Sequence, residues 1–214
     1  MVFCYNACTD TPMKSPIRKD LVLNFMRTQI LDLIKFIKPF DELEKEHIDD
    51  AVKWIQGGAE IFRIQKPDIP PKHLVSYFVL IDFNEKKILL MEHIKSGLWL
   101  PTGGHVEKGE HPKAAVEREC LEEIGTKPLF VSELPFFLTQ NRTVKMTKEH
   151  MDVSLWYVLR GDSKAPINYQ KEEFNGYKWF DYQELLKMPI EKLDAQMHRF
   201  TKKLLKSELW DGSK

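Results

Sequence analysis

The chain has 214 residues, of which 43% are hydrophobic, so it can bury a core and its composition argues against global disorder. Its 32 basic and 32 acidic residues give a formal net charge of zero, which removes any overall attraction to nucleic acid or to an anionic membrane. Three cysteines, Cys4, Cys8 and Cys120, are an odd number without regular spacing and argue against a disulfide framework. With no secretory signal and no run of about 20 apolar residues, the sequence predicts a soluble, cytoplasmic protein.

The first part of the chain predicts a tail followed by a helix. Prolines among Thr, Asp, Lys and Ser make residues 1–19 a flexible tail. From Asp20 onward apolar residues recur at helical spacing, and Pro39 ends this helix. The recurring residues are Leu23, Met26, Ile30, Leu33, Ile34 and Ile37.

A second helix completes a helical hairpin over residues 20–66. Asp41 is its predicted N-cap, and Glu44 completes a capping-box-like pair. The glycine pair at 57–58 supplies the stop signal. The apolar face of this helix is predicted to comprise Leu43, Ile48, Val52 and Ile55. That face is covered either by the following domain or by another subunit, so a homodimer is one option.

The remainder of the chain predicts a second domain over residues 67–210. The segment KPDIPPK at 66–72 cannot continue a helix or a central strand and marks the boundary. Five segments rich in β-branched, aromatic and aliphatic residues follow, the first two forming a hairpin. They are 73–82, 86–94, 129–141, 151–161 and 175–182. An amphipathic helix is predicted over 191–205, and a mixed sheet with helices packed on its faces is expected.

A central helix with three clustered glutamates carries the chemical signal. Gly103 and Gly104 open a loop whose main chain can approach a ligand or a metal closely. The helix that follows starts near Pro112 and is broken by Gly125. Its three glutamates share one edge because they lie at i, i+3 and i+4; they are Glu119, Glu122 and Glu123. A solvated acidic face is one explanation, but three convergent carboxylates also suit a hard divalent cation such as Mg²⁺ or Mn²⁺.

The stretch from Gly104 to Thr126 resembles the Nudix box, G-x(5)-E-x(7)-R-E-U-x-E-E-x-G-U, where U is a bulky apolar residue. Every fixed position is matched, by Gly104, Glu110, Arg118, Glu119, Glu122, Glu123 and Gly125. Cys120 and Thr126 depart from the bulky apolar positions, which concerns packing rather than chemistry. The resemblance implies a Nudix-type α/β/α sandwich preceded here by the helical hairpin.

The resemblance also implies the roles of the site residues. As catalytic residues it indicates Arg118, Glu119, Glu122 and Glu123. As ligands of Mg²⁺ or Mn²⁺ it indicates Glu119, Glu122, Glu123 and Glu110, the last with a bracing role as an alternative. As substrate-binding residues we expect Gly103, Gly104, His105 and Trp99. Glu119 is the first choice within the box for the base that accepts a proton from water.

Residues outside the box give weaker signals. His150 and Asp152 are candidates for a supporting role, although a turn residue and a strand-edge charge are the simpler explanations. Tyr77, Phe78 and Trp99 are aromatic residues that either stack on a base or belong to the core. Arg63 and Lys72 flank the domain boundary and either neutralise phosphate or remain exposed.

Similar proteins hydrolyse a nucleoside diphosphate linked to another moiety, so we expect a divalent-metal-dependent pyrophosphohydrolase. Its partner would be a nucleotide-type small molecule, with no membrane and no specific nucleic acid implied. A ligand-binding or regulatory module on the same fold is the alternative, because fold alone does not fix function. Isomerase chemistry on a prenyl diphosphate has little support, because Cys120 occupies a packing position of the helix.

Overall fold

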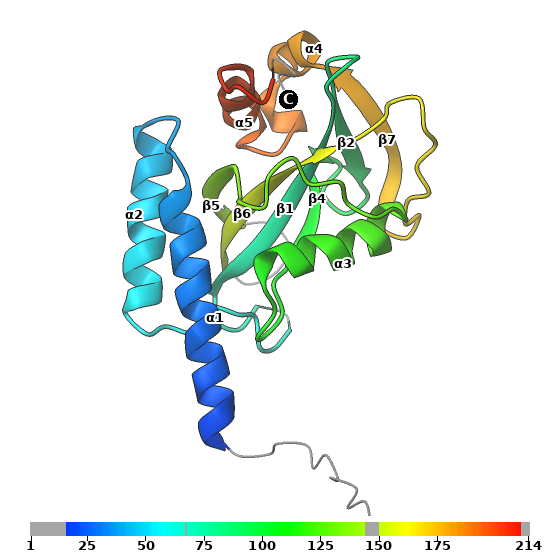
Figure 1. The fold of residues 1–214 in the computed structure, drawn as a ribbon. Helices are drawn as coiled ribbons and strands as arrows, with labels where there is room; N and C mark the ends of the chain where they lie inside the picture. Colours follow the sequence, from blue (N-terminus) through cyan, green and yellow to red (C-terminus); the bar gives the residue numbers. More distant parts are fainter. Residues whose placement is uncertain (1–15, 67, 144–149, 211–214) are drawn as a thin grey trace, which may run out of the picture.

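The computed structural model describes residues 16–66, 68–143 and 150–210, so the predicted tail up to residue 15, with Cys4 and Cys8, lies outside the described residues. Two helices come first, then a mixed sheet with further helices (Figure 1). The helices are α1 (Pro16–Phe36), α2 (Glu42–Gln56), α3 (Pro112–Ile124), α4 (Tyr182–Lys187) and α5 (Met197–Leu205), with a short 3₁₀ helix η1 (Ile190–Lys192). The strands are β1 (Lys72–Asp82), β2 (Lys87–His93), β3 (Trp99–Leu100), β4 (Thr102–His105), β5 (Phe137–Thr143), β6 (His150–Arg160) and β7 (Phe174–Asp181).

Strand β1 organises the seven-stranded sheet. It runs parallel to β6, from Lys72 opposite Met151 to Ile81 opposite Arg160. Two strands share the other edge of β1, both antiparallel to it: β4 pairs with its middle, residues 75–78, and β2 with its last two residues. The sheet continues through β2 to β3 and β7, and through β6 to β5. The mixed sheet is therefore as predicted, and β1 stands beside every strand that reaches the site described below.

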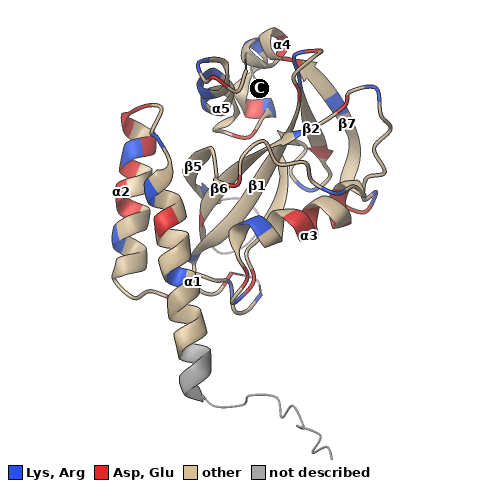
Figure 2. Ribbon diagram, in the orientation of Figure 1, with Lys and Arg blue, Asp and Glu red and all other residues tan. Residues whose placement is uncertain are grey.

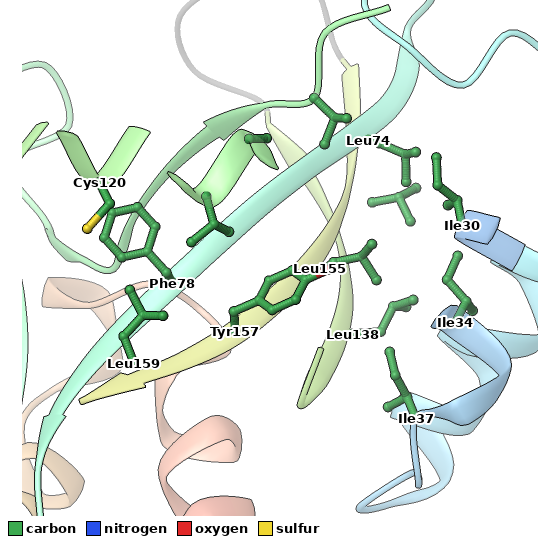
Figure 3. Close-up of a cluster of buried hydrophobic side chains, with 14 of the residues drawn as sticks. Ile30, Ile34, Ile37, Leu74, Phe78, Cys120, Leu138, Leu155, Tyr157 and Leu159 are labelled. Carbon is green, nitrogen blue, oxygen red and sulfur yellow. The ribbon is translucent and has the colours of Figure 1, made fainter. Parts of the chain in front are cut away.

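Successive side chains of β1 and β6 point to opposite faces of the sheet, so the hydrophobic core has two parts, one on each face. Leu74 and Phe78 of β1 pack with Leu155 and Tyr157 of β6 in one cluster, which also includes residues of α1, α2 and α3 (Figure 3). The neighbouring residues of both strands point to the other face, where they meet α4 and α5 in a second cluster. Helices cover both faces, which makes the domain an α/β/α sandwich.

The N-terminal hairpin packs on this domain. Ile30 and Ile34 of α1, with Ile37 directly after the end of this helix, are buried in the same cluster as Leu74 and Leu138 of the sheet (Figure 3). Helix α1 begins at Pro16, four residues earlier than the expected Asp20, because proline is tolerated in a first helical turn. The outer side of α1 leaves Leu21, Val22 and Phe25 exposed, and a homodimer stays a prediction.

Helix α2 differs in two details from its prediction. Leu43 is 43% exposed and does not belong to the buried face, where Glu44, Ile48, Ala51 and Ile55 lie instead. Asp41 caps the helix through the Glu44 N–H, at 2.9 Å, as predicted. The Glu44 carboxylate, however, accepts from the N–H of Phe40 rather than from that of Asp41, at 2.6 Å.

Several further elements differ from the predictions. Strand β3 was not predicted, and the strand expected over 129–141 begins only at Phe137, as β5. Gly103 and Gly104 lie in strand β4 and not in a loop, because the ladder with β1 satisfies their backbone. The predicted helix over 191–205 begins only at Met197, because η1 ends at Lys192 and Leu193 is extended and bridges to Trp99. Helix α4 was not predicted, although Asp181 caps it through the N–H of Gln183.

Candidate active site

Helix α3 carries the acidic residues of the site, and both of its ends are fixed locally. His111 caps the first turn by accepting from the N–H of Lys113, and Pro112 follows it. Gly125 ends the helix in a left-handed conformation, with φ of 66°, which glycine adopts without strain. Figure 2 shows acidic positions along α3 after a basic one near its start. The helix is therefore a rigid support for the glutamates.

Strand β4 lies so close to α3 that a side chain at Gly104 would displace a carboxylate of the helix. A Cβ atom built on Gly104 would lie 2.1 Å from Oε1 of Glu119. One residue earlier, the N–H of Gly103 donates to Oε2 of Glu123 at 2.8 Å. Gly103 has φ of 136°, and a Cβ there would lie 2.2 Å from the carbonyl oxygen of Ser76. The two predicted glycines thus hold the carboxylates of Glu119 and Glu123 against the sheet.

Arg118 ties the site together through its guanidinium group. Its Nε and Nη2 atoms each donate to a separate oxygen of Glu110, both at 3.0 Å. Nη1 donates to Oε1 of Glu119 at 2.6 Å and lies 3.5 Å from Oε2 of Glu122. Nη2 also donates to the carbonyl oxygen of His105 at 3.1 Å. Such forked, charge-assisted bonds fix orientation as well as charge.

Glu110 is held from two sides. Besides the two bonds from Arg118, its Oε2 accepts from the N–H of Glu107 at 2.9 Å. Both of its oxygens are therefore engaged within the protein, which matches the bracing role more closely than that of a metal ligand. The assignment of Glu110 as a ligand stays a prediction.

Burial makes the carboxylates of α3 unfavourable as isolated anions. Glu123 is only 4% exposed. Its pKa is raised well above the ordinary range, mainly by burial and to a smaller extent by the negative charge of the neighbouring Glu119. Burial also raises the pKa of Glu119, partly offset by Arg118. The side chain of Glu122 is 57% exposed at the open end of the cluster. Such a set of oxygen donors suits Mg²⁺ or Mn²⁺, because a dication would offset the charge that burial disfavours.

A cavity of about 860 Å³ opens beside these residues. Gly103, Gly104, His105, Arg118 and Glu119 line one side of it. Basic residues that precede β1 or follow β4 line another part, and these are Arg63, Lys66 and Lys108. Of the metal-ligand candidates in the box, Glu119 lines this cavity, while Glu110, Glu122 and Glu123 are not among its lining residues. The cavity thus brings one of these carboxylates together with cations that suit phosphate oxygens.

The other residues singled out from the sequence divide into two groups. Tyr77 and Asp152 line the cavity, as does Arg63, whose Nη1 lies 3.2 Å from Nε2 of His105. Trp99 is not among the lining residues of the described chain and instead packs edge-on against Phe180, with ring centroids 5.1 Å apart.

Two further residues lie away from the cavity. Phe78 is buried in the core beside α3. Lys72 pairs with Asp50 of α2 at 2.5 Å. Phe78 is therefore a core residue and Lys72 a partner in an ion pair with α2, and neither is placed to contact a substrate in this cavity.

The sequence did not single out His73 and Glu173. Glu173 lines the cavity and pairs with His93, at 3.8 Å, which lowers the pKa of this carboxyl. His73 of β1 is fully buried beside Asp152. A histidine inside a strand that is otherwise almost wholly apolar was the signal that could have identified His73.

Comparison with known proteins gives one family match that includes both the sheet and the box. A model of the NUDIX domain matches residues 72–204. The chain is 32% identical over 92 residues to an RNA pyrophosphohydrolase of Nitratiruptor sp., which covers 40% of this chain and 59% of that protein. It is 24% identical over 142 residues to Nudix hydrolase 25 of Arabidopsis thaliana, covering 58% of this chain and 81% of that protein.

Solved structures support the fold alone. A hydrolase of the NUDIX family from Clostridium perfringens superposes with a TM-score of 0.50 at 20% identity, covering 62% of this chain and 95% of that one. The matched part begins at β1, so the hairpin of α1 and α2 precedes the domain model. No helix among the described residues is both long and apolar enough to cross a bilayer.

Proposed function

Because the chain belongs to the NUDIX domain family, we propose that it is a divalent-metal-dependent hydrolase that cleaves a phosphoanhydride bond in a nucleoside diphosphate derivative. The observation that carries this proposal is the convergence of Glu119 and Glu123 on β4, with Arg118 bonded to Glu119, at the wall of a cavity rimmed by basic residues.

The carboxylates of α3 are the proposed holders of Mg²⁺ or Mn²⁺. Glu119 and Glu123 would supply buried oxygens, and Glu122 an exposed one. A dication bound there supplies charge neutralisation for the phosphates and lowers the pKa of water. Arg118 and Gly103 would keep two of these carboxylates in place, since each donates a hydrogen bond to one of them.

The remaining groups of the cavity have separate proposed tasks. Arg63, Lys66 and Lys108, which line the cavity, would bind phosphate oxygens. Glu119 is our candidate for the base, because its carboxylate lines the cavity in which the attacking water would lie. Tyr77 lines the same cavity and would contact the nucleoside portion with its ring.

A panel of substrates tests this proposal. We would incubate the protein, with and without Mg²⁺, with nucleoside triphosphates, dinucleoside polyphosphates, ADP-ribose, nucleotide sugars and 5′-triphosphorylated RNA. Released phosphate or nucleoside monophosphate identifies the bond that is cleaved. Metal-dependent turnover of at least one compound is expected.

Matched variants separate the site from the rest of the helix. Glu119→Gln and Glu123→Gln should each lower turnover by at least about 100-fold, as expected when a group that acts on the transition state is removed. Glu117→Gln, an exposed position of the same helix, should leave turnover unchanged. Binding of Mg²⁺ and nucleotide without turnover of any compound would instead support the ligand-binding module.

A further inference from the structure

A second group of metal-ligating side chains lies at the same cavity, on the sheet rather than on α3. Adjacent strands contribute one residue each: His105 from β4, His73 from β1 and Asp152 from β6. The parallel register places His73 directly opposite Asp152. One ligand atom from each of the three residues lies within 4.8 Å of the other two. His105 and Asp152 line the cavity, so the cluster is open to it.

The hydrogen bonds of His73 decide which nitrogen faces the cluster. Nδ1 of His73 lies 2.8 Å from the carbonyl oxygen of Pro70, and since a carbonyl only accepts, Nδ1 carries the proton. In the neutral ring Nε2 then has a lone pair. This atom is fully buried, and among the described residues it has no hydrogen-bond partner in good geometry. It nevertheless lies 3.2 Å from Oδ1 of Asp152.

Two acceptor atoms at that distance repel each other unless something positive lies between them. A proton would do this by making His73 an imidazolium, and a metal ion would do it by binding both atoms. Two ligands of one tetrahedral zinc ion, each about 2.0–2.1 Å from the metal, lie about 3.3 Å apart. The separation between His73 and Asp152 is therefore that of neighbouring ligands. A backbone carbonyl bonded to the other ring nitrogen is also the usual support of a metal-bound histidine.

His105 also has a ring nitrogen with a lone pair. Its Nε2 lies 3.2 Å from Nη1 of Arg63, and because a guanidinium only donates, this nitrogen also carries a lone pair. Arg63 already brings a positive group to this position, and a metal ion would displace it. Two imidazoles and one carboxylate favour a transition-metal ion over Mg²⁺, which prefers oxygen ligands only.

We propose that His73, His105 and Asp152 form a binding site for a transition-metal dication of the Zn²⁺ type, separate from the carboxylates of α3. A tetrahedral ion with three protein ligands keeps a fourth position for water or a ligand oxygen, and His105 and Asp152 line the cavity that would supply it. His150 stacks on His73, with ring centroids 5.5 Å apart, and its Nε2 lies 3.5 Å from Oδ1 of Asp152. His150 therefore lies beside two of the three proposed ligands.

Metal retention tests the site without any assay of hydrolysis. The full chain, stripped with a chelator, is titrated with Zn²⁺ against a chromogenic chelator in the presence of saturating Mg²⁺, and the metal content is then measured by mass spectrometry. One zinc ion per chain is expected, and Co²⁺ should give the intense visible absorption of a tetrahedral site. His105→Ala and Asp152→Asn should each weaken Zn²⁺ binding by at least about 10-fold. His198→Ala, a histidine bonded to Leu185 outside the cavity lining, should change nothing.

Two more variants make the assignment specific. Glu119→Gln combined with Glu123→Gln should lose Mg²⁺ binding and keep the zinc ion, so failure of the proposed function and failure of this site are distinguishable. Arg63→Ala should lower the Zn²⁺ concentration needed for half-saturation, because a competing cation is removed. Circular dichroism and the melting temperature establish that each variant is folded, and His105→Gln replaces His105→Ala if that variant is not.

Two results would overturn the proposal. Absence of retained zinc in the folded wild-type chain would mean that a proton alone joins His73 to Asp152. Equal zinc affinity in wild type, His105→Ala and Asp152→Asn would place the ion elsewhere.

Discussion

Lys203 of α5 donates to Oε1 of Glu44 of α2 at 2.7 Å, and this ion pair joins the last helix to the N-terminal hairpin. Glu44 is fully buried and Lys203 is 8% exposed. The carboxylate also accepts from the N–H groups of Phe40 and Leu138. Burial raises the pKa of Glu44 and lowers that of Lys203, so each charge depends on its partner.

Removal of one partner of this pair should therefore destabilise the fold strongly. Lys203→Met leaves the Glu44 carboxylate buried without its counter-charge, and we expect a loss of about 3–5 kcal/mol in the free energy of unfolding. Lys202→Met, the exposed neighbour on the same helix, should change it by less than about 0.5 kcal/mol. Urea unfolding measures both. Equal stability of the two variants would show that the buried pair does not hold the hairpin to the domain.

Gly104→Ala should damage the site while sparing the fold. The new Cβ would meet Oε1 of Glu119, the far end of a flexible side chain, so the carboxylate moves and the backbone does not need to. We expect turnover about 100-fold lower, as misplacement of a reacting group by about 1 Å can produce. Gly176→Ala is the matched control, because a Cβ there meets no described atom within 4 Å. Full activity of Gly104→Ala would remove Glu119 from the catalytic set.

Gly103→Ala should do the opposite and destabilise the protein. Its backbone has φ of 136°, and the added Cβ would meet the backbone oxygen of Ser76, which cannot rotate away. A loss of at least about 2 kcal/mol in the free energy of unfolding is expected, measured by urea unfolding beside Gly104→Ala. A Gly103→Ala protein as stable as wild type would contradict the close approach of β4 to β1.

Arg118→Lys tests the forked hydrogen bonds at the centre of the site. Lysine keeps the charge but cannot bond both oxygens of Glu110 and one of Glu119 in a fixed plane. We expect Mg²⁺ affinity to fall about 10–100-fold, as it does when groups that orient metal ligands are replaced. Calorimetric titration with Mg²⁺ measures this, with Arg199→Lys as a control remote from the cavity lining. Unchanged affinity would mean that charge alone is sufficient at this position.

The lowered pKa of Asp41 should make the free energy of unfolding depend on pH. Hydrogen bonds from Arg199, opposed by burial, lower the pKa of Asp41 below its ordinary value of 3.8. Between the folded and the unfolded pKa the unfolded chain binds more protons, so the stabilisation is complete above the unfolded pKa and is lost as pH falls through the folded one. Asp41→Asn keeps the helix cap and removes the charge. Wild type should therefore lose more stability than Asp41→Asn on acidification below about pH 4, in urea titrations at a series of pH values. Parallel loss in both proteins would contradict the role of Arg199.

Much of the site was predictable because its pattern is local. Helical periodicity alone places Glu119, Glu122 and Glu123 on one edge, and the box spacing identified Gly104, Glu110 and Arg118 beside them. The longer strands were predictable too, because each is a single run of apolar and β-branched residues. Strand β4 was not, because glycines read as a loop until pairing with β1 makes them a strand.

The sequence by itself therefore determined the acidic helix, the mixed α/β class and the existence of the hairpin, since each depends on residues a few positions apart. Only the tertiary structure decided that Glu44 meets Lys203, that Arg63 reaches His105 and that His73 lies opposite Asp152. Those contacts join residues 42 to 159 positions apart. They depend on strand order and register, which periodicity within a segment does not encode.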